Sequence, residues 1–285
     1  MDAMTKTEAM LKADLNWTVS RQPVYDNQGR ELSEFKAITR DDNGKVFHIS
    51  RNRYTPFQNE TLFNIVEEVT ETGAAKYVKA GCYKEGAYVY AVVAVPDANF
   101  EVVPGDVCKT YLRISTSHDG SSSIMLWPEV YRQVCSNGMH AWVKDAARTI
   151  SVRHTESAKT RLNIDAKRLL EREIQYFRTF AEQSRAMAQK EFDMLRIDSF
   201  LKELFEIEDS EDVSARTMNQ MRDIAYLARR GKGVEYAPNT AWAVYNGVTE
   251  YVTHHRGSDA ENRAVSALMG AGRDLRERAF ALLTR

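Results

Sequence analysis

The sequence predicts an α+β fold, in which an antiparallel, hairpin-rich sheet with one or two helices is followed by a helical C-terminal half. Two observations indicate this division. Up to residue 156 short β-prone runs alternate with turn residues, and from residue 157 apolar residues recur at helical spacing. Strands followed by helices, rather than alternating with them, are typical of α+β proteins. We expect three regions: a flexible or short helical N-terminus (1–14), a strand-rich core (15–156), and a helical region (157–285) that packs on the core or on a partner subunit.

Hairpin signals justify the predicted sheet. The Asn43-Gly44 pair lies between the β-prone runs 34–40 and 45–51, and both residues tolerate the positive φ of a tight hairpin turn. Lys84-Glu85-Gly86 separates two further runs, of which the second is apolar on both faces and is typical of a central strand. The remaining strands are predicted at residues 17–25, 76–83, 87–95, 100–103, 107–115, 123–127, 130–135 and 148–154, with a break at Pro128.

Helix signals are sparse in the first half and dominant in the second. Asn59 is placed to cap a helix over residues 60–71, and a short helix is expected from Asn137 to Val143. Residues 161–191 contain almost no helix breakers and combine apolar residues with many charges, which predicts one long amphipathic helix. Further helices are predicted at residues 197–205, 213–230 and 240–255, and from a capping box at Ser258 and Glu261 to Leu283.

Length and composition are those of an ordinary globular protein. The 285 residues include 43% hydrophobic and 28% charged residues. The formal net charge of −1 gives no overall attraction to nucleic acid, so a nucleic-acid surface would have to be a local basic patch. No apolar run approaches the ~20 residues that span a bilayer, and the N-terminus lacks the apolar region of a signal peptide. Three scattered cysteines without CxxC spacing favour a reducing compartment, so we expect a cytoplasmic protein that does not bind membranes.

Three polar clusters lie between residues 111 and 155, next to predicted strands. They are residues 117–120, 132–137 and 153–155. Polar side chains at the ends of buried strands commonly build functional sites, so these clusters are where we look for one.

The candidate catalytic residues are His118, Asp119, Cys135 and His154. His118 and Asp119 can serve as an acid–base pair, as metal ligands or as phosphate contacts, but an Asp-Gly pair also suits a simple hairpin turn. Cys135 can act as a nucleophile beside a histidine, although a buried free cysteine more often packs as a small hydrophobic residue. No HExxH, P-loop or GxGxxG motif is present, and the choice between these interpretations stays open.

A second set of residues favours nucleic-acid binding. A single-strand platform needs cations for the phosphates and aromatic rings for the bases. Basic residues beside aromatic ones on predicted hairpins and strand ends fit that need, and the alternative is an ordinary sheet surface with core aromatics. The candidate contacts are Arg51, Arg53, Tyr54, Arg132, Arg153 and His154.

Several separated motifs are familiar in this order. They are LNWTVSRQPVY (15–25), HISRNRYTPFQNE (48–60), SHDGSSSI (117–124), VYRQVCSNG (130–138), SVRHT (151–155) and NTAWAVYNGVTEYVTHHRG (239–257). Together they resemble the phage/plasmid-like proteins of domain-of-unknown-function family 932, over about residues 15–283. The resemblance transfers no catalytic residues. Members occur on phages, plasmids and integrated islands, which implies DNA maintenance or recombination of a mobile element. Ser136 departs mildly from the family pattern, which often has asparagine there.

We therefore expect a nucleic-acid-binding protein of a mobile element, more a binding protein than an enzyme. The specific form we expect is a Rad52-like single-strand annealing protein that prefers single-stranded DNA and forms a homo-oligomer, with no cofactor. Two alternatives stay open. One is a hydrolase or nuclease that depends on a divalent metal or on the Cys135 and histidine pair. The other is a non-catalytic protein that binds a host factor, for example to counter a defence system.

Overall fold

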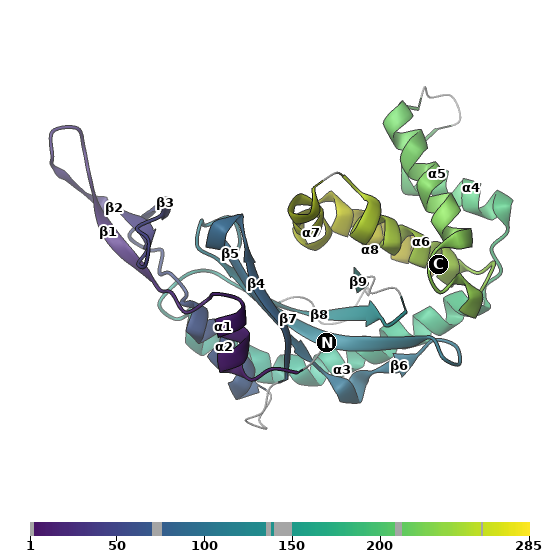
Figure 1. Ribbon diagram of the computed structural model, residues 1–285, viewed down its shortest axis with the longest axis horizontal. Coiled ribbons are helices and arrows are strands. Elements are labelled where there is room, and N and C mark those ends of the chain that lie inside the picture. Colours follow the sequence, from purple (N-terminus) through teal and green to yellow (C-terminus); the bar gives the residue numbers. More distant parts are fainter. Residues whose placement is uncertain (1–2, 70–75, 135–137, 140–149, 209–212, 258) are drawn as a thin grey trace. The chain divides into compact units, whose positions relative to one another are not determined.

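The computed structural model describes residues 3–69, 76–134, 138–139, 150–208, 213–257 and 259–285 (Figure 1). The fold is α+β, with antiparallel sheets in the N-terminal half and helices in the C-terminal half. The chain divides into two compact units that each combine separated segments. The first unit consists of Met1–Ala94, Tyr111–Pro128 and Ala147–Glu173, and the second of Val95–Thr110, Glu129–Ala146 and Ile174–Arg285. The three-region division drawn from composition stays a prediction.

A three-stranded antiparallel sheet belongs to the first unit. Its strands are β1 (Val19–Tyr25), β2 (Glu31–Arg40) and β3 (Val46–Arg51), in that order across the sheet. Figure 1 shows β1 and β2 as a long ribbon closed by a turn. Strands β2 and β3 pair antiparallel across the turn, so the predicted hairpin is confirmed, although only Gly44 (φ +72°), and not Asn43, adopts the positive φ of the expected tight turn.

A second sheet contains seven strands in the order β10-β8-β7-β5-β4, with β6 paired to β7 and β9 paired to β8. Its hairpin β4–β5 turns at Lys84–Gly86, as predicted, and β5 is buried over nearly its whole length between β4 and β7. The strands are β4 (Tyr77–Tyr83), β5 (Tyr88–Ala94), β6 (Phe100–Glu101), β7 (Val107–Ser117), β8 (Ile124–Arg132), β9 (Gly138–Met139) and β10 (Ile150–Val152).

Pro128 does not break its strand, and this prediction was wrong. Strand β8 pairs with β10 through Ile124–Leu126 and with β9 through Val130–Tyr131. Pro128 therefore lies between the residues that pair with β10 and those that pair with β9, and the strand continues through it. The short helix expected after Asn137 is also not found where the chain is described, because Gly138–Met139 form β9; Asn137 and residues 140–143 lie outside the described residues.

The predicted helices form, with shifted ends. Thr5 and Glu8 make a capping box on the first helix, so the segment before residue 14 is helical. The long helix expected over residues 161–191 is α3, of 32 residues. The helices are α1 (Lys6–Lys12), α2 (Asn59–Val69), α3 (Ala158–Gln189), α4 (Met194–Leu204), α5 (Ala215–Arg230), α6 (Ala241–Glu250) with a π-helical turn (Tyr251–His255), α7 (Ala260–Met269) and α8 (Ala271–Leu283).

The C-terminal helix predicted as one element is two. Gly270 has extended backbone angles (φ −131°, ψ −159°), which end α7 and begin α8. The N-cap of α7 is Asp259, whose side chain accepts a hydrogen bond from the Asn262 amide, and not Ser258, which lies outside the described residues. The capping pattern was read one residue too early because Ser and Asp are equally good caps.

The second unit contains a continuous apolar core with a buried ion pair beside it. The Asp106 carboxylate accepts bonds from Arg132 Nε (2.5 Å) and Nη2 (2.8 Å), and from Trp242 Nε1 (2.8 Å). Arg132 Nη2 also donates to the carbonyl of Gly233 at 2.7 Å. The ion pair is almost completely buried, so it ties three separated parts of the chain together. The largest completely buried side chains of this core are Phe177, Phe180, Trp242, Tyr245 and Phe280.

Removing the charge of Asp106 should destabilise the protein strongly. Asp106→Asn keeps the shape and an acceptor for Trp242, but it leaves the Arg132 guanidinium buried without a counter-charge. We expect a loss of about 3–5 kcal/mol in the free energy of unfolding, measured by urea denaturation. The matched control is Asp198→Asn, which removes the same charge from an exposed pair with Lys202 and should cost less than about 1 kcal/mol. Equal losses in the two variants would show that the buried pair does not hold this core.

Candidate nucleic-acid interface

Segments far apart in the sequence meet in the first unit, just after β3 and just after β10. The carbonyl of His154 accepts a hydrogen bond from the Thr55 amide at 3.1 Å. The Tyr54 ring stacks on the His154 ring, with centroids 4.7 Å apart and an interplanar angle of 17°. Two residues that the sequence proposed separately as nucleic-acid contacts are therefore neighbours, and their flanking arginines, Arg53 and Arg153, extend from the same junction.

Both rings contribute to holding the loop between β7 and β8, which we call the serine turn (residues 117–123). Three side chains from outside the turn donate to its carbonyl oxygens. The bonds are His48 Nδ1 to His118 O (2.9 Å), Tyr54 Oη to Ser117 O (3.0 Å) and His154 Nε2 to Ser122 O (3.2 Å). Burial raises the pKa of Tyr54, so its hydroxyl keeps the proton that it donates. These bonds satisfy carbonyls that the surrounding protein shields from water.

Asp119 is part of the serine turn itself. Its carboxylate accepts a hydrogen bond from the Ser121 amide at 2.9 Å, and Gly120 has a φ of +72°. A Cβ added at Gly120 would lie 3.1 Å from Nε2 of His48, so the turn also needs a glycine for close packing. The turn interpretation of the Asp-Gly pair is therefore correct, and it accounts for the contacts of Asp119.

His118 is part of the serine turn, and its side chain is completely buried. Its Nε2 donates to Asn59 Oδ1 at 2.9 Å, and its ring lies 5.3 Å from Trp17 and 5.6 Å from Phe47 between ring centroids. The side-chain amide of Asn59 in turn donates to the carbonyls of Leu15 and Trp17. Asn59 begins α2 as predicted, but its side chain links the N-terminal segment to His118.

Burial favours the neutral form of His118 and His154. Burial, and secondarily the nearby His154 imidazole, lowers the pKa of His118 to about 3. Burial also lowers the pKa of His154. Since Trp17, Phe47 and Asn59 enclose His118, it cannot reach a substrate in this conformation, and within the described residues no group of three His, Cys, Asp or Glu side chains is placed to hold a metal ion.

Two candidates remain, Arg132 and Cys135. Arg132 belongs to the second unit and is buried in its pair with Asp106, so its guanidinium has no surface to offer to a phosphate. Cys135 lies outside the described residues. From the sequence we grouped Arg132 with the exposed arginines because it also lies at the end of a strand. Its buried partner, Asp106, is more than twenty residues away in the chain and could not be recognised.

Four arginines belong to the segments that meet near the junction, and we call them the arginine patch: Arg21, Arg51, Arg53 and Arg153. In the strand register Arg21 faces Ile38 and Arg51 faces Phe35, so these two side chains start from opposite faces of the sheet. All four are exposed. Arg21 Nη2 donates to the carbonyl of Asn52 at 2.9 Å, which brings it from β1 to the end of β3. Glu34 and Glu156 are exposed nearby in the chain, but where the structure describes the chain no ion pair joins a carboxylate to the four arginines. Arg21 is not among the contacts that the sequence predicted.

Apolar side chains lie next to these cations on β2 and β3. In the register of the two strands Phe35 faces Arg51, and Ala37 faces Ile49. Residues two apart on a strand share a face, so Phe35, Ile49 and Arg51 lie on one side of the sheet. Ile49 is 57% exposed, and Tyr25 near the end of the ribbon is 56% exposed. This side of the sheet therefore combines a cation with uncovered apolar surface.

Comparison with known families identifies the chain. The model of the family described as Domain of unknown function (DUF932) matches residues 46–275, well over half of the chain. The chain belongs to the DUF932 family. Neither the curated proteins nor the solved structures gave a match. The DUF932 match contains β3, the serine turn and all of the candidate residues except Arg21. No helix in the described part of this DUF932 protein is both long and apolar enough to cross a membrane.

The buried histidines should make this DUF932 protein sensitive to acid. Below its usual pKa of 6.5 a histidine of the unfolded chain binds a proton, whereas folded His118 does not until about pH 3. The unfolded state binds more protons in this window, so the contribution of His118 to stability is complete above pH 6.5 and is lost as the pH falls toward 3. We expect a loss of up to about 1.4 kcal/mol per pH unit from this group, measured by urea denaturation across that range.

A His118→Gln variant separates this effect from the titration of carboxylates. Glutamine can still donate to Asn59, but it does not titrate. The variant should show a shallower pH dependence than the wild type between pH 6.5 and 3. The same slope in both proteins would contradict the assignment.

Proposed function

We propose that this DUF932 protein binds single-stranded nucleic acid, preferably DNA, through the arginine patch and the adjoining open face of β2 and β3. The observation that carries the proposal is the gathering, around Asn52 and Thr55, of four exposed arginines that have no carboxylate partner among the residues that the structure describes. Guanidinium groups bind phosphate oxygens through paired N–H donors, so a cluster of them suits a polyanion. A net charge of −1 leaves such binding to a local patch, which this cluster provides.

The neighbouring sheet face supports binding to a single strand rather than to a duplex. A single strand exposes its bases, which can pack on aromatic and apolar side chains while the cations hold the phosphates. Phe35 and Ile49 lie on the same face as Arg51, and Tyr25 extends the apolar surface along the ribbon. We assign the phosphates to the arginine patch and the bases to this face.

Tyr54 and His154 have a supporting role in this proposal. Their rings stack on each other, and their polar atoms bond to the serine turn. They fix the segments that carry Arg53 and Arg153, and they do not offer a free ring face to a base. Arg132 takes no part because its partner is Asp106.

The proposal includes self-association and an annealing activity of the Rad52-like kind. Large apolar side chains are exposed on α4 and α5 of the second unit, among them Leu195 (79%) and Tyr226 (61%). Exposed apolar residues of this size are candidates for contacts between subunits. Resemblance to proteins of phages and plasmids makes strand annealing the activity to test after binding.

Binding to single strands should depend on salt. Each phosphate contact with a single strand contributes about −0.7 to the slope of log K against log salt, so four arginines predict a slope of about −3. Fluorescence anisotropy of a labelled oligonucleotide between about 50 and 200 mM salt measures it, with mass photometry of the same sample to give the size of the assembly. A duplex of the same sequence should bind more weakly. No binding of either form at low salt would overturn the proposal.

Neutral variants of the patch locate the interface. Arg51→Gln, Arg53→Gln and Arg153→Gln should each weaken binding by about 1 kcal/mol and each make the salt slope shallower by about 0.7. The matched control is Arg222→Gln, which removes one exposed positive charge from α5 and should change neither quantity. Equal effects of the patch and control variants would mean that overall charge, and not the patch, governs binding.

A further inference from the structure

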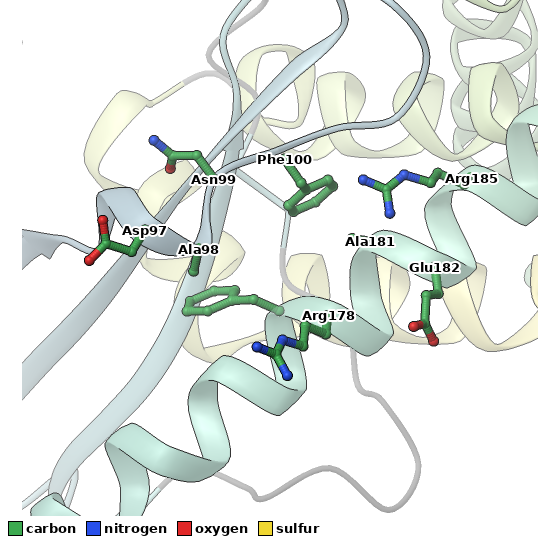
Figure 2. Close-up of a pocket in the computed structure, with 9 residues that line it drawn as sticks. Asp97, Ala98, Asn99, Phe100, Arg178, Ala181, Glu182 and Arg185 are labelled. Carbon is green, nitrogen blue, oxygen red and sulfur yellow. The ribbon is translucent and has the colours of Figure 1, made fainter.

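A pocket of about 200 Å³ lies in the second unit, between the turn at Pro96–Ala98, β6 and α3 (Figure 2). Two arginines, Arg178 and Arg185, belong to its lining, together with the rings of Phe100 and Phe177. All of these residues lie outside the arginine patch and outside the first unit. No role assigned so far uses this pocket.

The spacing of residues on α3 produces the hollow. Arg178, Ala181 and Arg185 are three and four residues apart, so they lie on one face of the helix. Ala181 has only a methyl group between the two long side chains, which leaves space above it. Phe177 is buried and closes the floor, whereas Phe100 is half-buried and still presents part of its ring.

Arg185 is held in place before any ligand binds. Its Nε donates to the carbonyl of Glu101 at 3.0 Å, which leaves the two terminal nitrogens for another acceptor. Figure 2 shows its guanidinium extending toward Phe100. Arg178 is exposed at the other end of the pocket, and in the described part of the chain neither arginine has a carboxylate ion pair.

Two carboxylates also belong to the lining, Asp97 and Glu182. Figure 2 shows both of them directed away from Phe100. The space beside the Phe100 ring is therefore approached by the Arg185 cation and not by a carboxylate, which favours an anionic group there.

The volume limits the size of the ligand. About 200 Å³ is several times the ~30 Å³ that one water molecule occupies in the liquid, so the pocket is more than a hydration site. It is smaller than the roughly 300–1,000 Å³ of pockets that enclose drug-sized molecules. One planar ring with its charged substituent at the rim fits these limits.

We propose that this pocket binds a nucleotide as a base–phosphate unit, with the base against Phe100 and the phosphate held by Arg185, while Arg178 adds positive charge at the other end of the pocket. A terminal phosphate carries a charge of about −1.5 to −2, which matches two cations better than a carboxylate does. The unit can come from a free mononucleotide or from the 5′-phosphorylated end of a strand. The proposal does not rest on the arginine patch, since none of its residues is shared.

Equilibrium dialysis of radiolabelled dTMP against the full-length protein at low salt tests the proposal. We expect saturable binding of one dTMP per chain that unlabelled dTMP competes away, and that thymidine, which lacks the phosphate, does not. Inorganic phosphate should compete more weakly than dTMP. Absence of saturable binding, or competition by inorganic phosphate at the same concentration as dTMP, would overturn the proposal.

Variants connect the binding to the pocket. Arg185→Gln should weaken dTMP binding about tenfold, since it removes a charged hydrogen bond, and Arg178→Gln should weaken it less, since it removes a more distant positive charge. Phe100→Ala should weaken it while leaving competition by inorganic phosphate unchanged. Arg222→Gln is the matched control and should bind dTMP like the wild type. Circular dichroism and the urea midpoint verify that each variant is folded, and unchanged binding in folded Arg185→Gln would contradict the assignment.

Two further experiments distinguish a free nucleotide from a strand end as the ligand, and the pocket from the arginine patch as the binding site. A 5′-phosphorylated oligonucleotide that competes more tightly than dTMP, with the difference lost in Arg185→Gln, assigns the pocket to strand ends; equal or weaker competition assigns it to free nucleotides. The triple variant Arg51→Gln, Arg53→Gln, Arg153→Gln should retain dTMP binding. If the triple variant still binds dTMP but no longer binds the oligonucleotide, both proposals stand. If the wild-type protein binds the oligonucleotide but not dTMP, only the pocket proposal fails.

Discussion

The carbonyl oxygens of the serine turn impose the constraint on which the candidate interface depends. A carbonyl removed from water needs a donor, and an unsatisfied one costs about as much free energy as a lost hydrogen bond. Here the donors are Tyr54, His48 and His154, which come from separate parts of the chain. Satisfying the turn therefore fixes the end of β3 beside the end of β10. The exposed arginines next to those donors are placed as a consequence.

In the second unit the buried carboxylate of Asp106 imposes a similar constraint, because it also needs hydrogen-bond donors from separate parts of the chain. It receives Arg132 and Trp242, and the guanidinium of Arg132 continues to the carbonyl of Gly233. Burying such a pair adds little net stability, but removing one partner is costly, so the bonds favour keeping these segments together. Gly233 is part of that arrangement, because its φ is +79° and an added Cβ would lie 2.8 Å from Nη1 of Arg132.

The sequence predicted the elements whose signals are local. The Asn-Gly turn and the unbroken amphipathic run gave β2–β3 and α3 because these depend on a few neighbouring residues. Pro128 was misjudged because its effect depends on which strands pair beside it, and pairing is not local. Asn59 was read as a cap, yet its amide bonds to Leu15 and Trp17, far away in the sequence.

The same limit applied to the site. Two of the three polar clusters, residues 117–120 and 153–155, meet beside Tyr54, and that they form a functional site stays a prediction. The chemistry of each residue could not be read in the same way. His118 carries the donors and acceptors of a catalytic base, but only the fold shows that Asn59 and two aromatic rings enclose it.

Arginines that look equivalent in the sequence differ in the structure by whether they form an ion pair. Arg40 binds Asp42 and lies over the Trp17 ring, Arg30 binds Asp26, and Arg132 binds Asp106, so these guanidinium groups already have partners. An exposed arginine without a carboxylate keeps its donors for an outside anion, at the cost of holding like charges near each other. The patch around Asn52 combines several such arginines with an open sheet face, and Arg178 and Arg185 combine two with a pocket. Among the described residues neither group of arginines has a carboxylate partner, and this is why we propose an anionic ligand for each rather than a reaction at the buried histidines.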